Sequence, residues 1–382
     1  MAVLLLFSLS TISAANQTIN DTSTGGISQG ITDTGTGDTL FLQSGTYNKT
    51  SDRGITISKN ITIQGNGSRD NVIIDAQGLN RIFTISAGYN VTFINVTFTN
   101  GNSTTDGGAI YATTGTMTFI NCTFTNNYQN GSNGGGAIRS GVDLYIYNCI
   151  FDNNTGRASG GALISNGGSV YIYNSIFANG HAGTTGGAIR NTGSLLFIDN
   201  CTFTNNSADS NAGAIYNTAL LSLNNTVFTD NSGSVGGAIY NNGGVNFSIN
   251  NCTFANNQAR SFGGAIHTTG ANLSIDNSTF INNTAATHGG AIRNDGANSY
   301  MNNCTFANNR AGSNGGAFYN TASNVSIYNS IFTDNNSTQN GGAIFSQGRA
   351  NVTIIDNRFT IMPQLVMVVL FIIMVICLCL VM

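Results

Sequence analysis

The sequence predicts an all-β fold: a single-stranded, right-handed parallel β-helix built from coils of about 26 residues. Two markers repeat in one register, and the residues between them alternate between apolar and polar. The first marker is the tetrapeptide Gly-Gly-Ala-Ile or a close variant, with a mean interval of 26 residues. Repetition at a fixed period is typical of solenoids, so each repeat is expected to form one coil. The marker begins at Gly107, Gly135, Gly160, Gly186, Ala212, Gly236, Gly263, Gly289, Gly315 and Gly341.

The second marker is a phenylalanine that follows an asparagine by three residues. Apolar side chains alternate before it, for example at Val91 and Phe93. Because alternate residues of a strand share one face, we expect three short strands in each coil: one at Gly-Ala-Ile, one at the alternating pair and one that ends at the phenylalanine. Each strand would pair with its equivalents in the neighbouring coils. The marker phenylalanines are Phe98, Phe124, Phe151, Phe177, Phe203, Phe228, Phe254, Phe280, Phe306 and Phe332.

Composition excludes several other classes of protein. Only 8% of the 382 residues are charged, all 16 acidic residues are Asp, and Lys occurs only at Lys49 and Lys59. Strong helix formers are therefore scarce, which argues against a helical bundle or a doubly wound α/β enzyme. The apolar fraction of 41% is too high for a disordered chain. The 13 Lys and Arg residues are too few for a nucleic-acid-binding surface, so no nucleic acid is expected as a partner.

The two ends differ from the repeats, and the chain divides into four predicted parts. Residues 1–15 form a short apolar run that ends in small residues, which is typical of a secretory signal peptide. Residues 16–97 keep the strand rhythm without the two markers and are expected to be N-terminal capping coils, whereas residues 98–359 hold the repeated coils. Residues 365–382 are uncharged and mostly apolar, and at ~1.5 Å per residue they are long enough for a transmembrane helix that anchors the chain. A buried terminal helix is the alternative.

An asparagine stands three residues before each marker phenylalanine, where the chain must bend between two strands. Stacked carboxamides can bond the backbone groups that such a bend leaves unpaired and can also bond one another, so these asparagines are expected to be structural. Sequons in the turns, such as those at Asn153 and Asn205, are the expected glycosylation sites. The bend asparagines are Asn95, Asn121, Asn148, Asn174, Asn200, Asn225, Asn251, Asn277, Asn303 and Asn329.

Five cysteines lie two residues before a marker phenylalanine, on its inward face. Cysteines two coils apart would be separated by ~9.6 Å, which is beyond disulfide reach; only Cys122 and Cys149 stand on neighbouring coils. We expect small buried residues in place of a disulfide framework, and neither a metal site nor a cofactor. The five are Cys122, Cys149, Cys201, Cys252 and Cys304.

The paired markers resemble the GGA(I,L)/FxxN repeats of chlamydial polymorphic membrane proteins. FxxN stands here at Phe124 to Asn127, Phe151 to Asn154 and Phe254 to Asn257. The opening from Gly37 to Leu42 and the segment Ile73 to Ala76 are similar to adhesin-like, right-handed β-helix surface proteins of methanogenic archaea. The resemblance covers about residues 30–359 and implies a cell-surface, extracellular location and a role in adhesion.

A binding surface is expected on the outer face of the Gly-Ala-Ile strands. If the isoleucine points inward, the residue after it points outward. Many of these outward residues are aromatic or Arg, and such side chains suit the recognition of sugars or partner proteins. Surface glycans or proteins of other cells are the expected partners; the alternative is that neighbouring aromatic residues only stabilise the sheet. The outward residues are Tyr111, Arg139, Ile164, Arg190, Tyr216, Tyr240, His267, Arg293, Tyr319 and Phe345, joined by a patch of Tyr145, Tyr147, Tyr171 and Tyr173 on the next sheet.

The main functional expectation is an adhesin-like or structural protein, not an enzyme. The alternative is a carbohydrate-active β-helix enzyme, either a polysaccharide lyase or a glycoside hydrolase. Such chemistry needs two spaced carboxylates, or a cation site with a base, but Asp152, Asp230 and Asp334 fall in equivalent turns of distant coils. The histidines, expected to be solvated surface residues without partners, are His181, His267 and His288.

Overall fold

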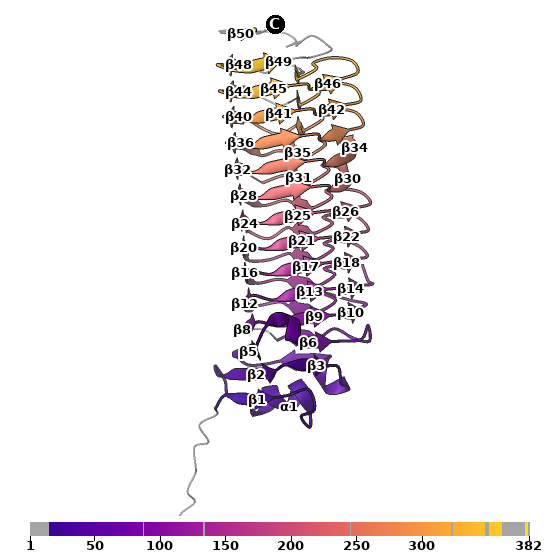
Figure 1. Cartoon of the computed structure of the whole chain (residues 1–382), viewed down its shortest axis with the longest axis vertical. Coiled ribbons are helices and arrows are strands. Elements are labelled where there is room, and N and C mark those ends of the chain that lie inside the picture. The colour runs from indigo at the N-terminus through magenta and orange to yellow at the C-terminus, as the bar shows by residue number, and fades with distance from the viewer. Residues whose placement is uncertain are drawn as a thin grey trace, which may run out of the picture.

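The protein is a long rod of stacked coils (Figure 1). The computed structural model describes residues 15–86, 88–132, 134–244, 246–321, 324–347, 351–360 and 379–380. About 13 coils of about 26 residues form a parallel β-solenoid, which confirms the predicted architecture. Every strand pairs in parallel with its equivalent in the next coil, as Phe124 does with Phe151.

The three predicted strands of each coil build sheets C, A and B, in the order of the chain. Sheet C contains β4 (Ile55–Ile57), β7 (Phe83–Ile85), β11 (Ile110–Ala112), β15 (Ile138–Ser140), β19 (Leu163–Ser165), β23 (Ile189–Asn191), β27 (Ile215–Asn217), β31 (Ile239–Asn242), β35 (Ile266–Thr269), β39 (Ile292–Asn294), β43 (Phe318–Asn320) and β47 (Ile344–Ser346). Sheet A contains β1 (Gln17–Ile19), β2 (Thr39–Gln43), β5 (Ile61–Asn66), β8 (Tyr89–Ile94), β12 (Gly115–Ile120), β16 (Asp143–Tyr147), β20 (Ser169–Tyr173), β24 (Leu195–Asp199), β28 (Leu220–Asn224), β32 (Asn246–Asn250), β36 (Asn272–Asp276), β40 (Ser299–Asn302), β44 (Val325–Tyr328) and β48 (Val352–Ile355). Sheet B contains β3 (Gly45–Tyr47), β6 (Val72–Asp75), β9 (Thr97–Thr99), β13 (Thr123–Thr125), β17 (Ile150–Asp152), β21 (Ile176–Ala178), β25 (Thr202–Thr204), β29 (Val227–Thr229), β33 (Thr253–Ala255), β37 (Thr279–Ile281), β41 (Thr305–Ala307), β45 (Ile331–Thr333), β49 (Arg358–Thr360) and β50 (Cys379–Leu380).

A fourth sheet, sheet D, was not predicted. Its strands follow sheet B in each coil, and most are only two residues long, which is too short for an alternating pattern to show. Its members are β10 (Asn102–Ser103), β14 (Tyr128–Gln129), β18 (Thr155–Gly156), β22 (His181–Ala182), β26 (Ser207–Ala208), β30 (Ser232–Val235), β34 (Gln258–Phe262), β38 (Thr284–Ala285), β42 (Arg310–Ala311) and β46 (Asn336–Ser337).

The marker phenylalanines form one continuous stack inside the rod. From Phe98 to Phe359, ring centroids in successive coils are 4.5–5.0 Å apart. All of these rings up to Phe332 are fully or almost fully buried. The inward isoleucines of sheet C, such as Ile189 and Ile215, are buried in the same core. Stacking therefore gives each coil a burial that one coil could not supply alone.

The asparagines at the bend between sheets A and B adopt the left-handed backbone conformation, with φ between 48° and 56°. Asparagine accepts this conformation more readily than other non-glycine residues. The carboxamides also bond along the rod, as predicted: the Asn121 side chain donates to Asn95 over 2.7 Å, and Asn200 donates to Asn174 over 2.8 Å. The predicted glycosylation sites Asn153 and Asn205 lie exposed at the next bend, and their modification stays a prediction.

The five cysteines named above are buried and free, as predicted. Their side chains belong to a ladder beside the bend, in which each side chain accepts a hydrogen bond from the backbone N–H of the preceding coil. The amide of Cys149 donates to the Ser175 hydroxyl over 3.0 Å, and the Ser175 amide donates to the Cys201 sulfur over 3.4 Å. Cysteine, serine and threonine can therefore alternate here, because each supplies an acceptor of similar size.

Replacing Cys201 with alanine is expected to lower the free energy of unfolding by about 1–2 kcal/mol, because the buried Ser175 amide loses its acceptor. Serine at the same position keeps an acceptor and should stay within about 0.5 kcal/mol of the wild type. Urea unfolding followed by circular dichroism measures both. Equal stability of the two variants would contradict the ladder's role.

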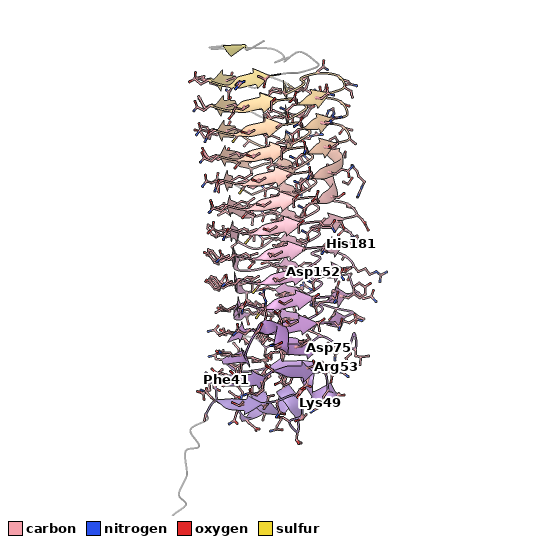
Figure 2. All side chains as sticks on the ribbon, in the orientation of Figure 1. Phe41, Lys49, Arg53, Asp75, Asp152 and His181 are labelled. Carbon is pink, nitrogen blue, oxygen red and sulfur yellow. The ribbon has the colours of Figure 1, made fainter. Side chains whose placement is uncertain are left out.

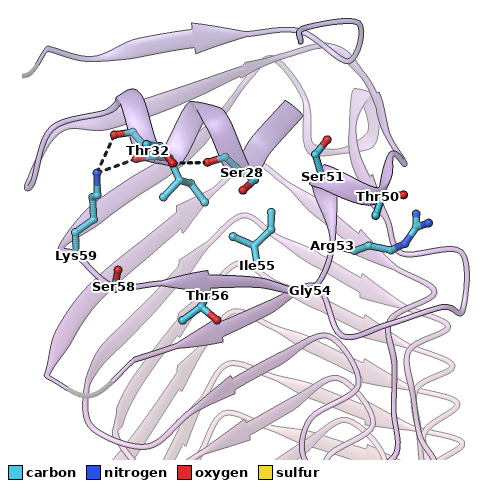
Figure 3. Close-up of a pocket in the computed structure, with 11 residues that line it drawn as sticks. Ser28, Thr32, Thr50, Ser51, Arg53, Gly54, Ile55, Thr56, Ser58 and Lys59 are labelled. Atoms are coloured by element: carbon cyan, nitrogen blue, oxygen red, sulfur yellow. Dashed lines mark hydrogen bonds between the residues drawn. The ribbon is translucent and has the colours of Figure 1, made fainter. Parts of the chain in front are cut away.

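The N-terminal end carries a helix in addition to the predicted capping coils. Helix α1 (Gly26–Asp33) buries Ile27 and Ile31 against the first coils. Asp52 follows it on the short 3-10 turn η1 (Thr50–Asp52) and accepts the Ile27 amide over 2.8 Å. At the other end of α1, the Lys59 ammonium donates to the carbonyls of Ile31 and Thr34 over 2.8 and 2.7 Å. It also donates to the carbonyl of Thr32 over 3.3 Å (Figure 3). A second 3-10 turn, η2 (Arg69–Asn71), precedes β6.

The predicted terminal segments fall largely outside the described residues. This applies to the signal peptide at residues 1–15, apart from its last residue, and to most of the apolar segment 365–382. Cys379 and Leu380 of that segment form β50, which pairs with Arg358 and Phe359, so the predicted transmembrane helix is not confirmed. In the part of the chain that the structure describes, no helix is both long and apolar enough to cross a membrane.

Candidate functional site

The predicted outward residues of sheet C form one row in register along the rod. We call this row the sheet C stripe. Strand pairing places its members in order as Tyr111, Arg139, Ile164, Arg190, Tyr216, Tyr240, His267, Arg293, Tyr319 and Phe345. Most of these side chains are half-buried, and Ile164, His267 and Tyr319 are only 1%, 6% and 4% exposed. A second row of bridged residues, directly before each Gly-Gly or Ala-Gly pair, runs from Ser159 to Asn340 and includes Phe262 and His288.

The N-terminal part of the stripe is occupied by its own contacts. The guanidinium groups of Arg81 and Arg139 lie 5.2 and 5.9 Å from the ring centre of Tyr111. Arg139 also forms an ion pair with Asp106. Cation–π and ionic contacts therefore satisfy these groups within the protein.

The middle of the stripe is more open to a ligand. The Arg190 guanidinium lies 5.9 Å from the ring centre of Tyr216, and no carboxylate within the described ranges forms an ion pair with it. The Asn242 side chain donates to the Tyr216 hydroxyl over 3.0 Å. Tyr216 meets Tyr240 edge to face, with ring centroids 5.6 Å apart.

Toward the C-terminus, three polar side chains converge on Asp295. His267 Nε2 and Arg293 Nε are 2.9 and 2.6 Å from Asp295 Oδ2, and the Thr321 hydroxyl donates to Oδ1 over 2.7 Å. The expectation that His267 is a solvated residue without a partner is therefore wrong. His267 comes from β35 and Arg293 from the next strand, β39, so stacking of the coils brings them to one carboxylate.

Aromatic rings enclose this polar group. His267 stacks on Tyr240 with ring centroids 4.9 Å apart, and the Arg293 guanidinium lies 3.8 Å from the ring centre of Phe262. His288, also expected to be solvated, instead stacks on Tyr319 at 4.5 Å. We call this set the His267 cluster; it consists of Tyr240, Phe262, His267, His288, Arg293, Asp295, Tyr319 and Thr321.

The electrostatics of the cluster favour a carboxylate beside a neutral imidazole. Burial opposes the charge on Asp295, but the hydrogen bonds from His267, Thr321 and Arg293 outweigh burial and bring its pKa to about 2. Burial, together with the Arg293 charge, lowers the pKa of His267 despite the opposing hydrogen bond and charge of Asp295. A neutral His267 that donates from Nε2 leaves Nδ1 as an acceptor, and this atom is buried without a described partner. A histidine held by a carboxylate in this way can act as a base.

Wild-type protein is expected to lose stability as the pH falls below the ordinary His pKa of 6.5. In that range the unfolded chain takes up a proton at His267 that the folded chain refuses, so unfolding is favoured, by at most about 1.4 kcal/mol per pH unit. Replacing His267 with glutamine should reduce this slope, and His288, whose pKa is also lowered by burial, should account for the part that remains. Thermal unfolding at a series of pH values measures it, with His181→Gln as the matched control because 43% of the His181 side chain is exposed.

The tyrosine patch on sheet A is present, but its rings face one another. Tyr145 stacks on Tyr171 with centroids 5.1 Å apart and 7° between the ring planes, and Tyr147 stacks on Tyr173 at 5.2 Å and 6°. Stacking covers the face of each ring that is turned toward its partner, so a sugar cannot stack on that face.

The remaining candidate residues do not assemble into a site. Asp152 and His181 are labelled on the outside of the rod in Figure 2, and His181 bonds the Ser207 hydroxyl over 3.0 Å. Asp230 and Asp334 occupy the left-handed bend after sheet B on distant coils. Across the described residues, no three His, Cys or acidic side chains gather closely enough to hold a metal ion.

The sequence did not indicate Asp295 or Phe262 as members of a site. A signal for Asp295 existed, because it stands two residues after Arg293 and alternate residues of a strand share a face. Phe262 and His288 also stand at one equivalent position, directly before Gly-Gly in neighbouring repeats. Period counting finds such rows, but it does not show which side chains bend toward each other.

Five segments of the chain match the repeat of the Chlamydia polymorphic membrane protein family: residues 200–218, 251–269, 277–295, 303–321 and 329–347. Each match starts at a bend asparagine and includes the following Gly-Ala-Ile or Gly-Ala-Phe strand. Because the matched segments make up well under half of the chain, they show only that this chain shares the repeat of that family. No curated protein matches the sequence closely enough to count as a relative, and no comparison tests the resemblance to archaeal surface proteins.

Three similar solved structures are carbohydrate-active enzymes. The catalytic unit of a GH87 α-1,3-glucanase from Streptomyces thermodiastaticus is 14% identical, with 90% of this chain and 70% of that chain covered and a TM-score of 0.52. A mannuronic-acid-specific family 6 polysaccharide lyase from human gut microbiota is 11% identical, with coverages of 89% and 87% and a TM-score of 0.41. The A-module of a mannuronan C-5 epimerase from Azotobacter vinelandii is 11% identical, with coverages of 87% and 89% and a TM-score of 0.39.

The glucanase likeness corrects one sequence-based expectation. The chain was expected not to be an enzyme, yet the solved structure with which it shares a fold is the catalytic unit of a glucanase. At 14% identity the glucanase likeness shows a shared fold. This fold carries chemistry on polysaccharides in other proteins, so it gives no reason to exclude catalysis here.

Proposed function

We propose that this protein is an adhesin-like β-solenoid of the cell surface that binds glycan chains along sheet C. Arg190 and Tyr216 would make the main contacts. The repeats shared with a family of membrane proteins support the surface location. The observation that carries the binding proposal is Arg190, a half-buried guanidinium in the middle of the stripe without a carboxylate among the described residues.

Arg190 has the chemistry that an acidic or hydroxyl-rich ligand needs. The other two arginines of the stripe, Arg139 and Arg293, are paired with aspartates. Arg190 has the ring of Tyr216 beside it and no carboxylate among the described residues. A planar guanidinium can form paired hydrogen bonds to a carboxylate or to adjacent hydroxyls. A ligand that follows the rod axis would meet Tyr216 and Tyr240 next.

Changing Arg190 and Tyr216 together to serine is expected to weaken glycan binding by at least about tenfold, because both anchoring contacts are lost. The assay uses the purified full-length chain on immobilised glycans and whole cells, beside circular dichroism. Arg157→Ser is the matched control, since it removes the same charge from an exposed turn outside the stripe. Unchanged binding by the double variant, or equal loss in the control, would contradict the proposal.

A second candidate function is catalysis on a polysaccharide at the His267 cluster. The specific observation is His267, which Asp295 orients and whose Nδ1 is left without a described partner. Reducing-sugar and unsaturated-uronate assays on the same polysaccharides test it. Product release that His267→Gln abolishes and His181→Gln retains would support catalysis at this cluster, whereas release that survives His267→Gln would place the chemistry elsewhere.

A further inference from the structure

A groove on the outer face of sheet A lies apart from the sheet C stripe. It crosses the coils of β32, β36, β40 and β44 and has a volume of about 710 Å³. Four rungs at ~4.8 Å each give it a length of about 14 Å along the rod. Its polar lining includes Asn246, Asn272, Asn298, Ser248, Ser274 and Tyr300.

Tyr300 stands in this groove between two serines. Strand pairing places Ser274 on one side of Tyr300 and Ser326 on the other. Tyr300 is 40% exposed, and within the described ranges its ring contact is with Tyr328, tilted by 41° at a centroid distance of 5.8 Å. A serine beside it cannot cover its ring as Tyr171 covers Tyr145. Tyr300 therefore keeps a ring face for a ligand, unlike the stacked tyrosines nearer the N-terminus.

A row of side-chain amides lies along the groove. Asn246 and Asn272 are register partners at the starts of their strands, and their side chains are weakly bonded to each other over 3.4 Å. Asn298 continues the row, and its side-chain oxygen accepts a hydrogen bond from the backbone N–H of Asn324 over 3.3 Å. Each carboxamide supplies donors and an acceptor. This combination matches hydroxyl groups, which also donate and accept.

The lining contains no charged side chain. The nearest ionisable group along β36 is Asp276, two residues beyond Ser274, and its carboxylate would repel an anion. The sheet C stripe, by contrast, carries three arginines. The groove therefore offers an acidic ligand no cation, whereas the stripe does.

We infer that this groove binds a neutral oligosaccharide. One sugar ring stacks on the open face of Tyr300, and the amides of Asn246, Asn272 and Asn298 bond its hydroxyl groups. The inference goes beyond the proposed function, because it concerns another sheet, other residues and a ligand without charge. Either site can fail while the other stands.

The test is calorimetric titration of the full-length chain with neutral hexasaccharides of glucose, mannose and galactose, and with oligomannuronate as the anionic probe. At least one neutral probe is expected to bind, and Tyr300→Ser is expected to weaken it about tenfold, because the stacking contact is lost. This variant should fold normally, since serine occupies the equivalent position in the coils on both sides. Tyr145→Ser is the matched control and should bind like the wild type.

The Arg190→Ser variant separates this site from the sheet C stripe and should retain the Tyr300-dependent part of neutral binding. The inference is overturned if no neutral probe binds the wild type, if Tyr300→Ser binds as tightly as the wild type, or if oligomannuronate binds in a Tyr300-dependent way. Loss of glycan binding in Arg190→Ser with intact Tyr300-dependent binding would support both sites.

Discussion

Replacing Gly290 with alanine is expected to cause one of the largest losses of stability of any single substitution in the rod. Gly290 is the second glycine of its marker, and a Cβ there would lie 1.9 Å from the carbonyl oxygen of Gly316 in the next coil. The backbone around this contact cannot move freely, because hydrogen bonds join the two coils there. The backbone N–H of Gly290, for example, donates to the carbonyl of Gly315 over 3.0 Å. The coils would have to separate, at a cost of more than about 4 kcal/mol in the free energy of unfolding.

The matched control is the first glycine of the same marker. Gly289 has φ of 68°, and a Cβ there would lie 2.3 Å from the Ile292 carbonyl oxygen, but Ala212 occupies the equivalent position with φ of 61°, so the chain can accommodate a Cβ there. Gly289→Ala should therefore cost only about 1–2 kcal/mol. Urea unfolding followed by circular dichroism compares the two variants. The account fails if Gly290→Ala unfolds at the wild-type urea concentration, or if Gly289→Ala is the less stable variant.

Much of this architecture could be predicted because a solenoid converts sequence period directly into position. Once Phe124 and Phe151 are recognised as equivalent, parallel stacking places them in neighbouring coils, and every residue between them follows in register. The outward row from Tyr111 to Phe345 was found in this way. No long-range pairing had to be guessed, since each coil contacts mainly its neighbours.

The features that sequence reasoning missed depend on contacts that have no local pattern. Helix α1 contains two glycines and few strong helix formers, so its propensity is low. It is held at one end by Asp52 and at the other by Lys59, both distant in sequence. Tertiary contacts, not local preference, thus explain this helix.

The His267 cluster was missed for a related reason. Period counting placed His267 and Arg293 in neighbouring rungs but did not show that both turn toward Asp295. Phe262 reaches the cluster from β34, where the pairing with β30 shifts by a residue. The mean period conceals this irregularity, although the sequence contains it: Gly236 lies eight residues after Phe228, whereas Gly263 lies nine residues after Phe254.

Replacing Asn257 with alanine is expected to cost about 4 kcal/mol of unfolding free energy, because it breaks a buried chain of carboxamides. The Asn257 side chain donates to the backbone carbonyl of Phe228 and to the side-chain carbonyl of Asn283, each over 3.0 Å. It also accepts from the backbone amide and the side chain of Asn231, over 3.1 and 3.0 Å. Alanine leaves the Asn231 amide buried without an acceptor, and water has no access to replace it, since Asn231 and Asn257 are fully buried.

The neighbouring Asn256 is the control that isolates this effect. It lies exposed at the left-handed bend, with φ of 56°, and Asp230 and Asp334 occupy the equivalent position in other coils. Asn256→Asp should therefore stay within about 0.5 kcal/mol of the wild type. Both variants are compared by urea unfolding. If Asn257→Ala were as stable as Asn256→Asp, the inner asparagines would contribute only filling volume, and the FxxN marker would need another explanation than hydrogen bonding between coils.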